Sequence, residues 1–236
     1  MYILGLTGSI GMGKSETARM FRRLGVPVFD ADAAVHVLLG RGGRAVRRVE
    51  SQFPGVVADG AVDRVALGQK VFGQPAELRK LEAILHPMVG QMQRQFLAAA
   101  CRRRLPLVVL DIPLLFEGRG EERCDATAVV SAPPLLQRQR VLARPNMTEE
   151  KFRHILGLQV PDSVKRQRAD FILSSGLGKA FTFALVRRLV VDLSRRRGRA
   201  WPPRGRPHRR PGRHPSRRPV HARERRARVV RQQGQR

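Results

Sequence analysis

The chain has 236 residues, enough for one sizeable hydrophobic core, and its 46 Lys and Arg against 19 Asp and Glu give a net charge of +27. No run of 18 apolar residues and no signal-peptide pattern occurs, so we expect no membrane span and no secretion. The two cysteines, Cys101 and Cys124, have neither metal-site nor disulfide spacing, which indicates reduced thiols in a cytoplasmic protein.

The first 40 residues predict a strand, a helix and a second strand. Residues 2–7 are a short apolar run typical of a buried strand, and the apolar spacing over 14–24 predicts a helix that Gly25 ends. A strand over 26–29 precedes a helix over 33–39. This β–α–β order predicts a parallel sheet and an α/β fold.

The rest of the chain predicts helices around further strands. Residues 42–104 are expected to be almost wholly helical, with a break and structural corner at His86-Pro87. Strands are predicted over 107–111, 126–131 and 171–173, and helices over 133–143, 148–158 (N-capped by Thr148) and 177–193. The predicted fold class is a three-layer α/β domain with about five parallel strands and a helical insertion.

A phosphate-binding loop lies between the first predicted strand and helix. Residues 8–15, Gly-Ser-Ile-Gly-Met-Gly-Lys-Ser, fit the pattern G-x-x-x-x-G-K-[ST]. Gly8 and Gly13 are expected to allow backbone angles that side chains block, so that the loop amides wrap a phosphate at a helix N-terminus. In this motif Lys14 reaches the β- and γ-phosphates of a nucleotide, and the Ser15 hydroxyl is a Mg²⁺ ligand.

Carboxylates are predicted at the same edge of the sheet, because ligands bind beyond the carboxyl ends of parallel strands. Asp30 and Asp32 follow the second strand, where helix capping is the main alternative for Asp30. The pair is suited to hold either a hydroxyl nucleophile or Mg²⁺. Asp111 ends the third strand and is a candidate Mg²⁺ ligand.

Together with further strings these residues resemble the dephospho-coenzyme A kinase family, in its order and over about 190 residues. The strings are the phosphate loop, Asp30-Ala31-Asp32, Leu85-His86-Pro87, Asp111-Ile112-Pro113-Leu114-Leu115-Phe116-Glu117, Gln159-Val160-Pro161-Asp162 and Lys165-Arg166-Gln167-Arg168-Ala169-Asp170-Phe171. The resemblance implies a phosphate-loop fold similar to nucleoside monophosphate kinases. It also implies that ATP, with Mg²⁺, phosphorylates the 3′-hydroxyl of dephospho-coenzyme A, the last step of coenzyme A synthesis.

The resemblance assigns parts of the chain to this reaction. A kinase domain over 1–194 would contain the acceptor-binding helices over 33–104 and a lid over 133–168. Asp32 would act on the 3′-hydroxyl proton, and Lys14 on the transferred phosphate. The implied nucleotide-binding residues are Gly11, Met12, Gly13, Lys14, Ser15, Glu16 and the lid arginines Arg138, Arg140 and Arg144.

Two positions depart from the family pattern, and one residue keeps two interpretations. Glu16 stands where Thr or Ser is usual, so it either swings outward or weakens ATP binding by repelling the α-phosphate. Met12 replaces a usual Ser at a position expected to face outward. Glu117 is expected either to bind the acceptor or to pair with a nearby arginine.

The C-terminal segment differs in composition from the rest. Residues 195–236 contain 17 Arg, one acidic residue and no Leu, Ile, Phe or Met, so we expect a disordered tail that binds polyanions non-specifically. The same composition is typical of a shifted reading frame in GC-rich DNA. Two other functions stay open: another phosphate-loop kinase of small molecules or nucleotides, and a nucleic-acid-binding protein that acts through this tail.

Overall fold

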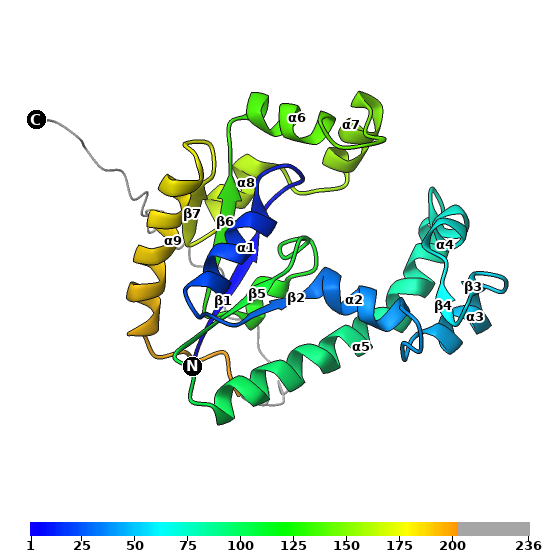
Figure 1. The fold of residues 1–236 in the computed structure, drawn as a ribbon, viewed down its shortest axis with the longest axis horizontal. Helices are drawn as coiled ribbons and strands as arrows, with labels where there is room; N and C mark the ends of the chain where they lie inside the picture. The colour runs from blue at the N-terminus through cyan, green and yellow to red at the C-terminus, as the bar shows by residue number, and fades with distance from the viewer. Residues whose placement is uncertain (203–236) are drawn as a thin grey trace, which may run out of the picture.

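The computed structural model describes residues 1–202, which fold around a five-stranded parallel sheet (Figure 1). The strands are β1 (Tyr2–Thr7), β2 (Val28–Asp30), β5 (Leu107–Asp111), β6 (Ala126–Ser131) and β7 (Phe171–Ser174), in the order β2-β5-β1-β6-β7. All neighbours pair in parallel, and Asp30 is in register with Asp111. The predicted fold class and strand number are therefore confirmed.

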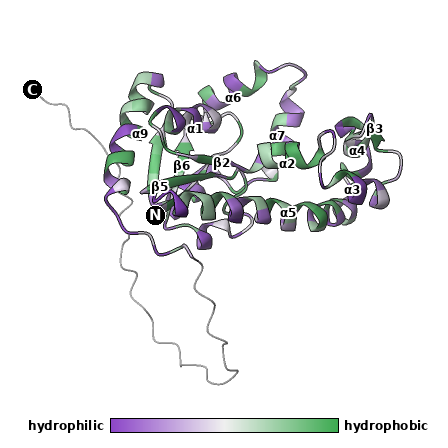
Figure 2. Ribbon diagram, turned by 60° about the horizontal axis from the view of Figure 1, so that its bottom comes forward, coloured by the Kyte–Doolittle hydropathy of each residue, from purple (hydrophilic) through white to green (hydrophobic). Residues whose placement is uncertain are grey.

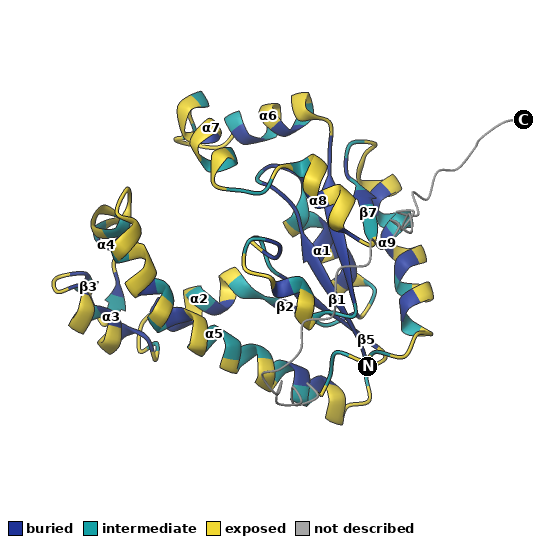
Figure 3. Cartoon of the chain, turned by 180° about the vertical axis from the view of Figure 1, so that it is seen from behind, coloured by how far each residue is buried: buried dark blue, intermediate teal, exposed yellow. Residues whose placement is uncertain are grey.

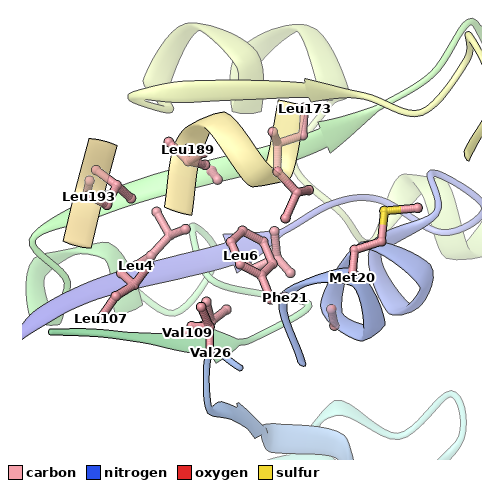
Figure 4. Packing of buried hydrophobic residues seen from close by; sticks show 14 of the residues in the cluster. Leu4, Leu6, Met20, Phe21, Val26, Leu107, Val109, Leu173, Leu189 and Leu193 are labelled. Carbon is pink, nitrogen blue, oxygen red and sulfur yellow. The ribbon is translucent and has the colours of Figure 1, made fainter. Parts of the chain in front are cut away.

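Helices cover both faces of the sheet because successive strand residues point to opposite sides. Leu4 and Leu6 pack against α1 (Lys14–Arg23) and α9 (Lys179–Ser194), through side chains such as Phe21 and Leu189 (Figure 4). Ile3 of the same strand faces the opposite layer, which α2 (Ala31–Leu39) and α5 (Pro75–Arg102) supply. The central strands are accordingly buried while the surrounding helices expose their outer faces (Figure 3).

An arm of helices extends from β2 and returns along α5 to the sheet (Figure 1). Besides α2 and α5 it contains α3 (Val46–Gln52), α4 (Arg64–Val71) and a hairpin of β3 (Val57–Ala58) and β4 (Ala61–Val62). A second hydrophobic core holds the arm together, with Leu38, Val49 and Leu85 among its buried members. The hairpin was not predicted from the sequence; Asp59 and Gly60 turn it, both at positive φ.

The predicted helix break at His86-Pro87 is wrong, since α5 runs without interruption from Pro75 to Arg102. Pro87 has no N–H and therefore cannot donate to the carbonyl of Ala83, one turn earlier. The helix continues because Leu81 and Leu85 before the proline, and Val89 after it, are packed in the arm's core. Tertiary packing thus outweighs the local preference of this dipeptide for a corner.

The region that the sequence predicted to be a lid contains three helices: α6 (Pro134–Leu142), α7 (Glu149–Gly157) and α8 (Asp162–Arg168). Thr148 caps α7 by accepting a hydrogen bond from the Lys151 amide, as predicted. The short helix α8 was not predicted. Before β6 a single 3-10 turn, η1 (Gly120–Arg123), completes the regular elements of the described residues. Figure 2 shows that α6 mixes hydrophobic and hydrophilic residues.

The structure moves the predicted domain boundary at residue 194. Residues 195–202, which we expected to be disordered, form a strap: Ala200 and Trp201 pack against the hydrophobic cluster that includes Leu97 and Ala100. Asp125 holds this strap by accepting hydrogen bonds from the amides of Arg199 and Ala200. Residues 203–236, with the rest of the predicted tail, lie outside the described residues. Within 1–202, no helix is both long and apolar enough to cross a membrane.

Candidate active site

The phosphate loop joins the end of β1 to the start of α1, as the sequence predicted. Gly11 and Gly13 have φ of 77° and 90°, which a side chain would strain. Gly8 does not have a positive φ, so the predicted reason for this glycine is wrong. A Cβ there would lie 2.8 Å from the Val130 carbonyl oxygen, and close packing against β6 is what requires glycine.

Lys14 points from the loop to the end of β5. Its ammonium lies 2.6 Å from Oδ1 of Asp111, and the Asp111 side chain is only 2% exposed. Burial raises the pKa of Asp111 above its usual value, and Asp30 and Asp32 add to this effect, although Lys14 opposes it. Ser15 is exposed at the start of α1. The Lys14 cation and the buried Asp111 carboxylate are therefore paired at the carboxyl edge of the sheet, and Ser15 follows Lys14 in the first turn of α1.

Asp30 and Asp32 have different surroundings. Asp30 is the N-cap of α2, accepting from the Ala33 amide at 2.9 Å, and it lies 3.6 Å from the guanidinium of Arg22. Its predicted capping role is confirmed. Asp32 lies in the first turn of α2, is exposed, and has no side-chain hydrogen bond or ion pair within residues 1–202. Its carboxylate is thus available to a ligand.

A pocket of about 220 Å³ adjoins the loop between α1 and α9. Side chains from the phosphate loop, both helices, the lid and the β7–α9 connection surround it: Gly13, Glu16, Thr17, Met20, Arg140, Ser175, Gly178, Lys179 and Thr182. Glu16 lies in its wall, with its carboxylate oxygens 2.5 Å from Arg19 and 3.9 Å from Lys179. The carboxylate is therefore partly neutralised.

Met12 faces inward, contrary to the prediction. It is 2% exposed, and its sulfur accepts a contact from the Ala132 amide at 3.1 Å. The Met12 carbonyl accepts a hydrogen bond from the hydroxyl of Ser175, which also accepts one from Arg140. Ser175 was missed by sequence reasoning, since a serine after a short strand carries no motif. It ties the loop to the lid.

The three predicted lid arginines are not equivalent. Arg140 lies against the phosphate loop, where a Cβ on Gly13 would be 3.7 Å from its guanidinium. Arg138 instead pairs with Glu149 at 2.9 Å and so joins α6 to α7. Arg144 is exposed just after α6. The structure therefore brings Arg140 to the loop and gives Arg138 a partner within the lid.

The tip of the loop is held by the lid through the backbone of Ile10. The Gln137 side-chain amide donates to the Ile10 carbonyl at 2.8 Å, and the Ile10 amide donates to Gln159 Oε1 at 3.1 Å. Neither glutamine was predicted to have this role, although Gln159 belongs to a string that carried the resemblance. These two hydrogen bonds connect α6 and the residues after α7 to the phosphate loop.

Glu117 pairs with a lysine rather than the arginine considered from the sequence. Its Oε1 lies 3.0 Å from Nζ of the fully buried Lys165 and accepts a hydrogen bond from the Val160 amide at 2.9 Å. Burial raises the pKa of Glu117, but these partners outweigh burial and the pKa lies below its usual value. This pair joins the segment after β5 to the return of the lid.

Arg64 is a further residue that sequence reasoning missed. It begins α4, and its guanidinium lies 3.2 Å from both ring nitrogens of His36. His36 follows Asp32 by four residues on α2, so the two side chains share one face of that helix. Arg64 therefore places an exposed cation beside His36, the residue one helical turn after Asp32 on α2.

This geometry agrees with comparisons to known proteins. The sequence profile of the dephospho-CoA kinase family matches residues 2–178. The chain belongs to the dephospho-CoA kinase family. A dephospho-CoA kinase of Paramagnetospirillum magneticum is 64% identical over 166 residues, covering 70% of this chain and 78% of that protein. One of Mesorhizobium japonicum is 52% identical over 198 residues, covering 84% of this chain and all of that protein.

Solved structures support the same fold. TT1252 from Thermus thermophilus has a TM-score of 0.71 at 35% identity, covering 81% of this chain and 96% of that one. A dephospho-CoA kinase from Campylobacter jejuni has a TM-score of 0.56 at 22% identity, over 81% and 96% of the two chains, a likeness that shows the fold alone. The resemblance to the dephospho-CoA kinase family is thereby confirmed.

Proposed function

We propose that this chain transfers the γ-phosphoryl group of ATP to the 3′-hydroxyl of dephospho-coenzyme A, giving coenzyme A and ADP. The family match over residues 2–178 is the observation that carries the proposal. The site supports it, because Lys14, Asp111 and Asp32 gather at the carboxyl edge of the sheet. The match favours neither of the alternatives left open by the sequence, another small-molecule kinase or a nucleic-acid-binding protein.

The phosphate donor binds at the loop in this proposal. The amides of residues 11–16 surround the β-phosphate, and Lys14 leaves Asp111 to follow the γ-phosphate toward the acceptor. Arg140 already lies beside Gly13 and adds positive charge there. Arg144 is assigned to the same task on the lid, whereas Arg138 joins α6 to α7 through Glu149. Phosphoryl transfer needs positioning and charge stabilisation more than covalent help, and these cations supply both.

The acceptor binds on the arm of α2–α5. Asp32 takes or orients the proton of the 3′-hydroxyl, for which an exposed carboxylate without a partner in the described residues is suited. Arg64, which contacts His36 one turn after Asp32, offers a cation to the diphosphate of dephospho-coenzyme A. The proposed base thus lies on α2, and the proposed phosphate-binding cation lies on α4, which contacts α2 through His36.

Ser15 and Asp111 are the proposed Mg²⁺ ligands. A hydroxyl and a carboxylate are the hard oxygen donors that this ion prefers. The Asp111 carboxylate is buried and lies at the end of β5. Residues 1–202 contain no group of three or more His, Cys, Asp or Glu side chains suited to a metal. These two residues would hold Mg²⁺ by their oxygen atoms, and the ion would supply positive charge to the phosphates.

A coupled assay with ATP, Mg²⁺ and dephospho-coenzyme A tests the proposal, with Asp32→Asn as the diagnostic variant. We expect kcat to fall by at least about 10², since general-base assistance contributes 10²–10⁴, while KM for ATP stays unchanged. The matched control is Asp59→Asn, which neutralises an exposed carboxylate in the β3–β4 turn. A loss confined to ATP binding, or an equal loss in the control, contradicts the role of Asp32.

A further inference from the structure

Two exposed aromatic side chains join the lid to the acceptor arm. Phe72 follows α4 on the arm and is 73% exposed, yet its ring centroid lies 5.6 Å from that of His154 in lid helix α7, with the planes tilted by 53°. The rings are tilted toward each other, at a centroid distance within the range of favourable aromatic pairs. Figure 1 shows the lid and the arm as separate extensions from the sheet, so the pair bridges two parts distant in sequence.

His154 is rigidly connected to the arginine-bearing helix of the lid. The Arg138–Glu149 ion pair at 2.9 Å fixes α7 to α6, and the buried Phe152 anchors α7 one turn from Glu149. Helix α6 in turn holds Arg140 on Ser175 and Gln137 on the phosphate loop. A displacement of His154 therefore moves the groups that surround the nucleotide.

The other end of the pair is connected to the acceptor site. Phe72 follows directly after α4, whose first residue is Arg64. Val71, beside Phe72, and Leu67 pack in the core that holds α2 and α5 together. The position of Phe72 is therefore set by the same packing that places Asp32 and Arg64.

We propose that Phe72 and His154 form a clasp that sets the distance between the lid and the acceptor arm, which makes both positioning residues for phosphoryl transfer. The clasp rests on the proposed function. A single aromatic pair changes an equilibrium by about two- to tenfold. Because transfer depends on alignment of donor and acceptor, its loss lowers kcat while ATP binding, made at the loop, is retained.

The kinetic test compares Phe72→Ala with Leu78→Ala, which also shortens an exposed apolar side chain of the arm. We expect Phe72→Ala to lower kcat about two- to tenfold with Kd for ATP unchanged, and Leu78→Ala to have no effect. His154→Ala should match Phe72→Ala, His154→Phe should restore turnover, and the double alanine variant should be no worse than either single variant. Equal effects of Phe72→Ala and Leu78→Ala, or additive losses in the double variant, overturn the clasp.

A second measurement does not depend on the reaction. Amide hydrogen exchange over 149–157 in the full chain without substrates should be faster in Phe72→Ala than in wild type and Leu78→Ala, because α7 loses its contact with the arm. Unchanged exchange there overturns the clasp, whatever the turnover. If wild type does not phosphorylate dephospho-coenzyme A, the proposed function fails while the exchange experiment still decides the clasp. Because Phe72 and His154 are both exposed, these variants are expected to fold.

Discussion

Asp111 shows how a residue needed for a ligand can cost stability. Its carboxylate is almost fully buried, and burial raises its pKa although Lys14 lies only 2.6 Å away. A carboxyl group whose pKa is raised on folding favours the fold when protonated. This contribution is present below the unfolded pKa and is lost as pH rises through the folded pKa. At neutral pH the ionised Asp111 therefore lowers the free energy of unfolding.

Asp111→Asn should therefore raise the melting temperature at pH 7 while it lowers turnover. The amide mimics the protonated carboxyl group, so the gain should shrink as pH falls through the raised pKa of Asp111 in the folded protein, and it should be gone below the usual Asp value of 3.8. Loss of the proposed Mg²⁺ ligand should lower kcat by about 10² or more. Melting curves from pH 3 to 8 for both proteins check the sign. A variant less stable than wild type at pH 7 would show that the Lys14 pair outweighs burial.

Glu16 lies in the wall of the pocket beside the phosphate loop, and two nearby cations partly neutralise its carboxylate. Glu16→Thr removes the carboxylate and frees Arg19 and Lys179 to face the nucleotide, so ATP should bind about fivefold more tightly at low salt. The gain should diminish at high salt because these side chains are partly exposed. Calorimetric Kd values at two salt concentrations check this, with Glu150→Thr on the lid as control. Unchanged affinity at low salt refutes an effect of Glu16 on ATP.

Some single residues could be predicted because a motif fixes their role, whereas the role of others depends on three-dimensional packing. Lys14 was predicted at the ligand edge because the loop pattern itself places a helix N-terminus there. Met12 faces inward and Gly8 is required by the nearby Val130 carbonyl, neither of which a sequence pattern encodes. The contacts of Ser175 with the loop and Arg140 arise only when β7 is placed beside β6.

At the scale of elements, the buried Glu117–Lys165 pair holds α8 to the segment after β5. Lys165 is fully buried, and Oε2 of Glu117 has no hydrogen-bond partner within residues 1–202. The attraction between two buried charges offsets the cost of removing them from water only while both partners are present. Loss of either partner is therefore expected to weaken the connection between α8 and the segment after β5.

Lys165→Met should destabilise the protein by about 3 kcal/mol, because it leaves the Glu117 carboxylate without its cation. The double variant Glu117→Gln/Lys165→Met should recover much of that loss, since no buried charge remains. Urea unfolding of wild type, the two single variants and the double variant gives the coupling free energy. If the double variant were as unstable as the sum of the singles, packing rather than charge would explain the role of Lys165.

The strands were predicted closely because each is a short, continuous apolar run with polar residues, glycine or proline next to it. Residues 107–111 and 126–131 are strands as predicted, buried between two helical layers. The arm was predicted less well: the β3–β4 hairpin has strands of two residues, too short for a periodic pattern. In α5 the proline signal was outweighed by packing on both sides of Pro87.

For the whole molecule, the described fold ends with a strap rather than with α9. Asp125 receives the amides of Arg199 and Ala200 on one carboxylate oxygen and that of Ile3 on the other, so it joins the C-terminal strap to β1. Gly198 passes so close to Met1 that a Cβ would collide with the Met1 carbonyl. Composition could not reveal this docking, because a basic segment with one tryptophan resembles a disordered tail.

Two truncations separate the strap from the basic residues that follow it. Ending the chain after Pro202 should leave turnover and melting temperature unchanged. It removes 13 Arg and one Glu, so it should abolish most salt-sensitive binding to RNA or DNA. Ending it after Ser194 should in addition remove the Trp201 packing and the Asp125 hydrogen bonds. That loss is worth about 2–3 kcal/mol, or roughly 5–10 °C in melting temperature.

Thermal melts, turnover and polyanion affinity of the full chain and both truncations distinguish these contributions, and Trp201→Ala in the full chain is the matched point change. Trp201→Ala should reproduce part of the thermal loss without changing polyanion affinity, because Trp201 packs against the hydrophobic cluster and its replacement keeps the net charge. If the chain ended after Ser194 melted like the one ended after Pro202, the strap would contribute no stability and the domain would end with α9. If ending after Pro202 lowered turnover, residues 203–236 would belong to the enzyme.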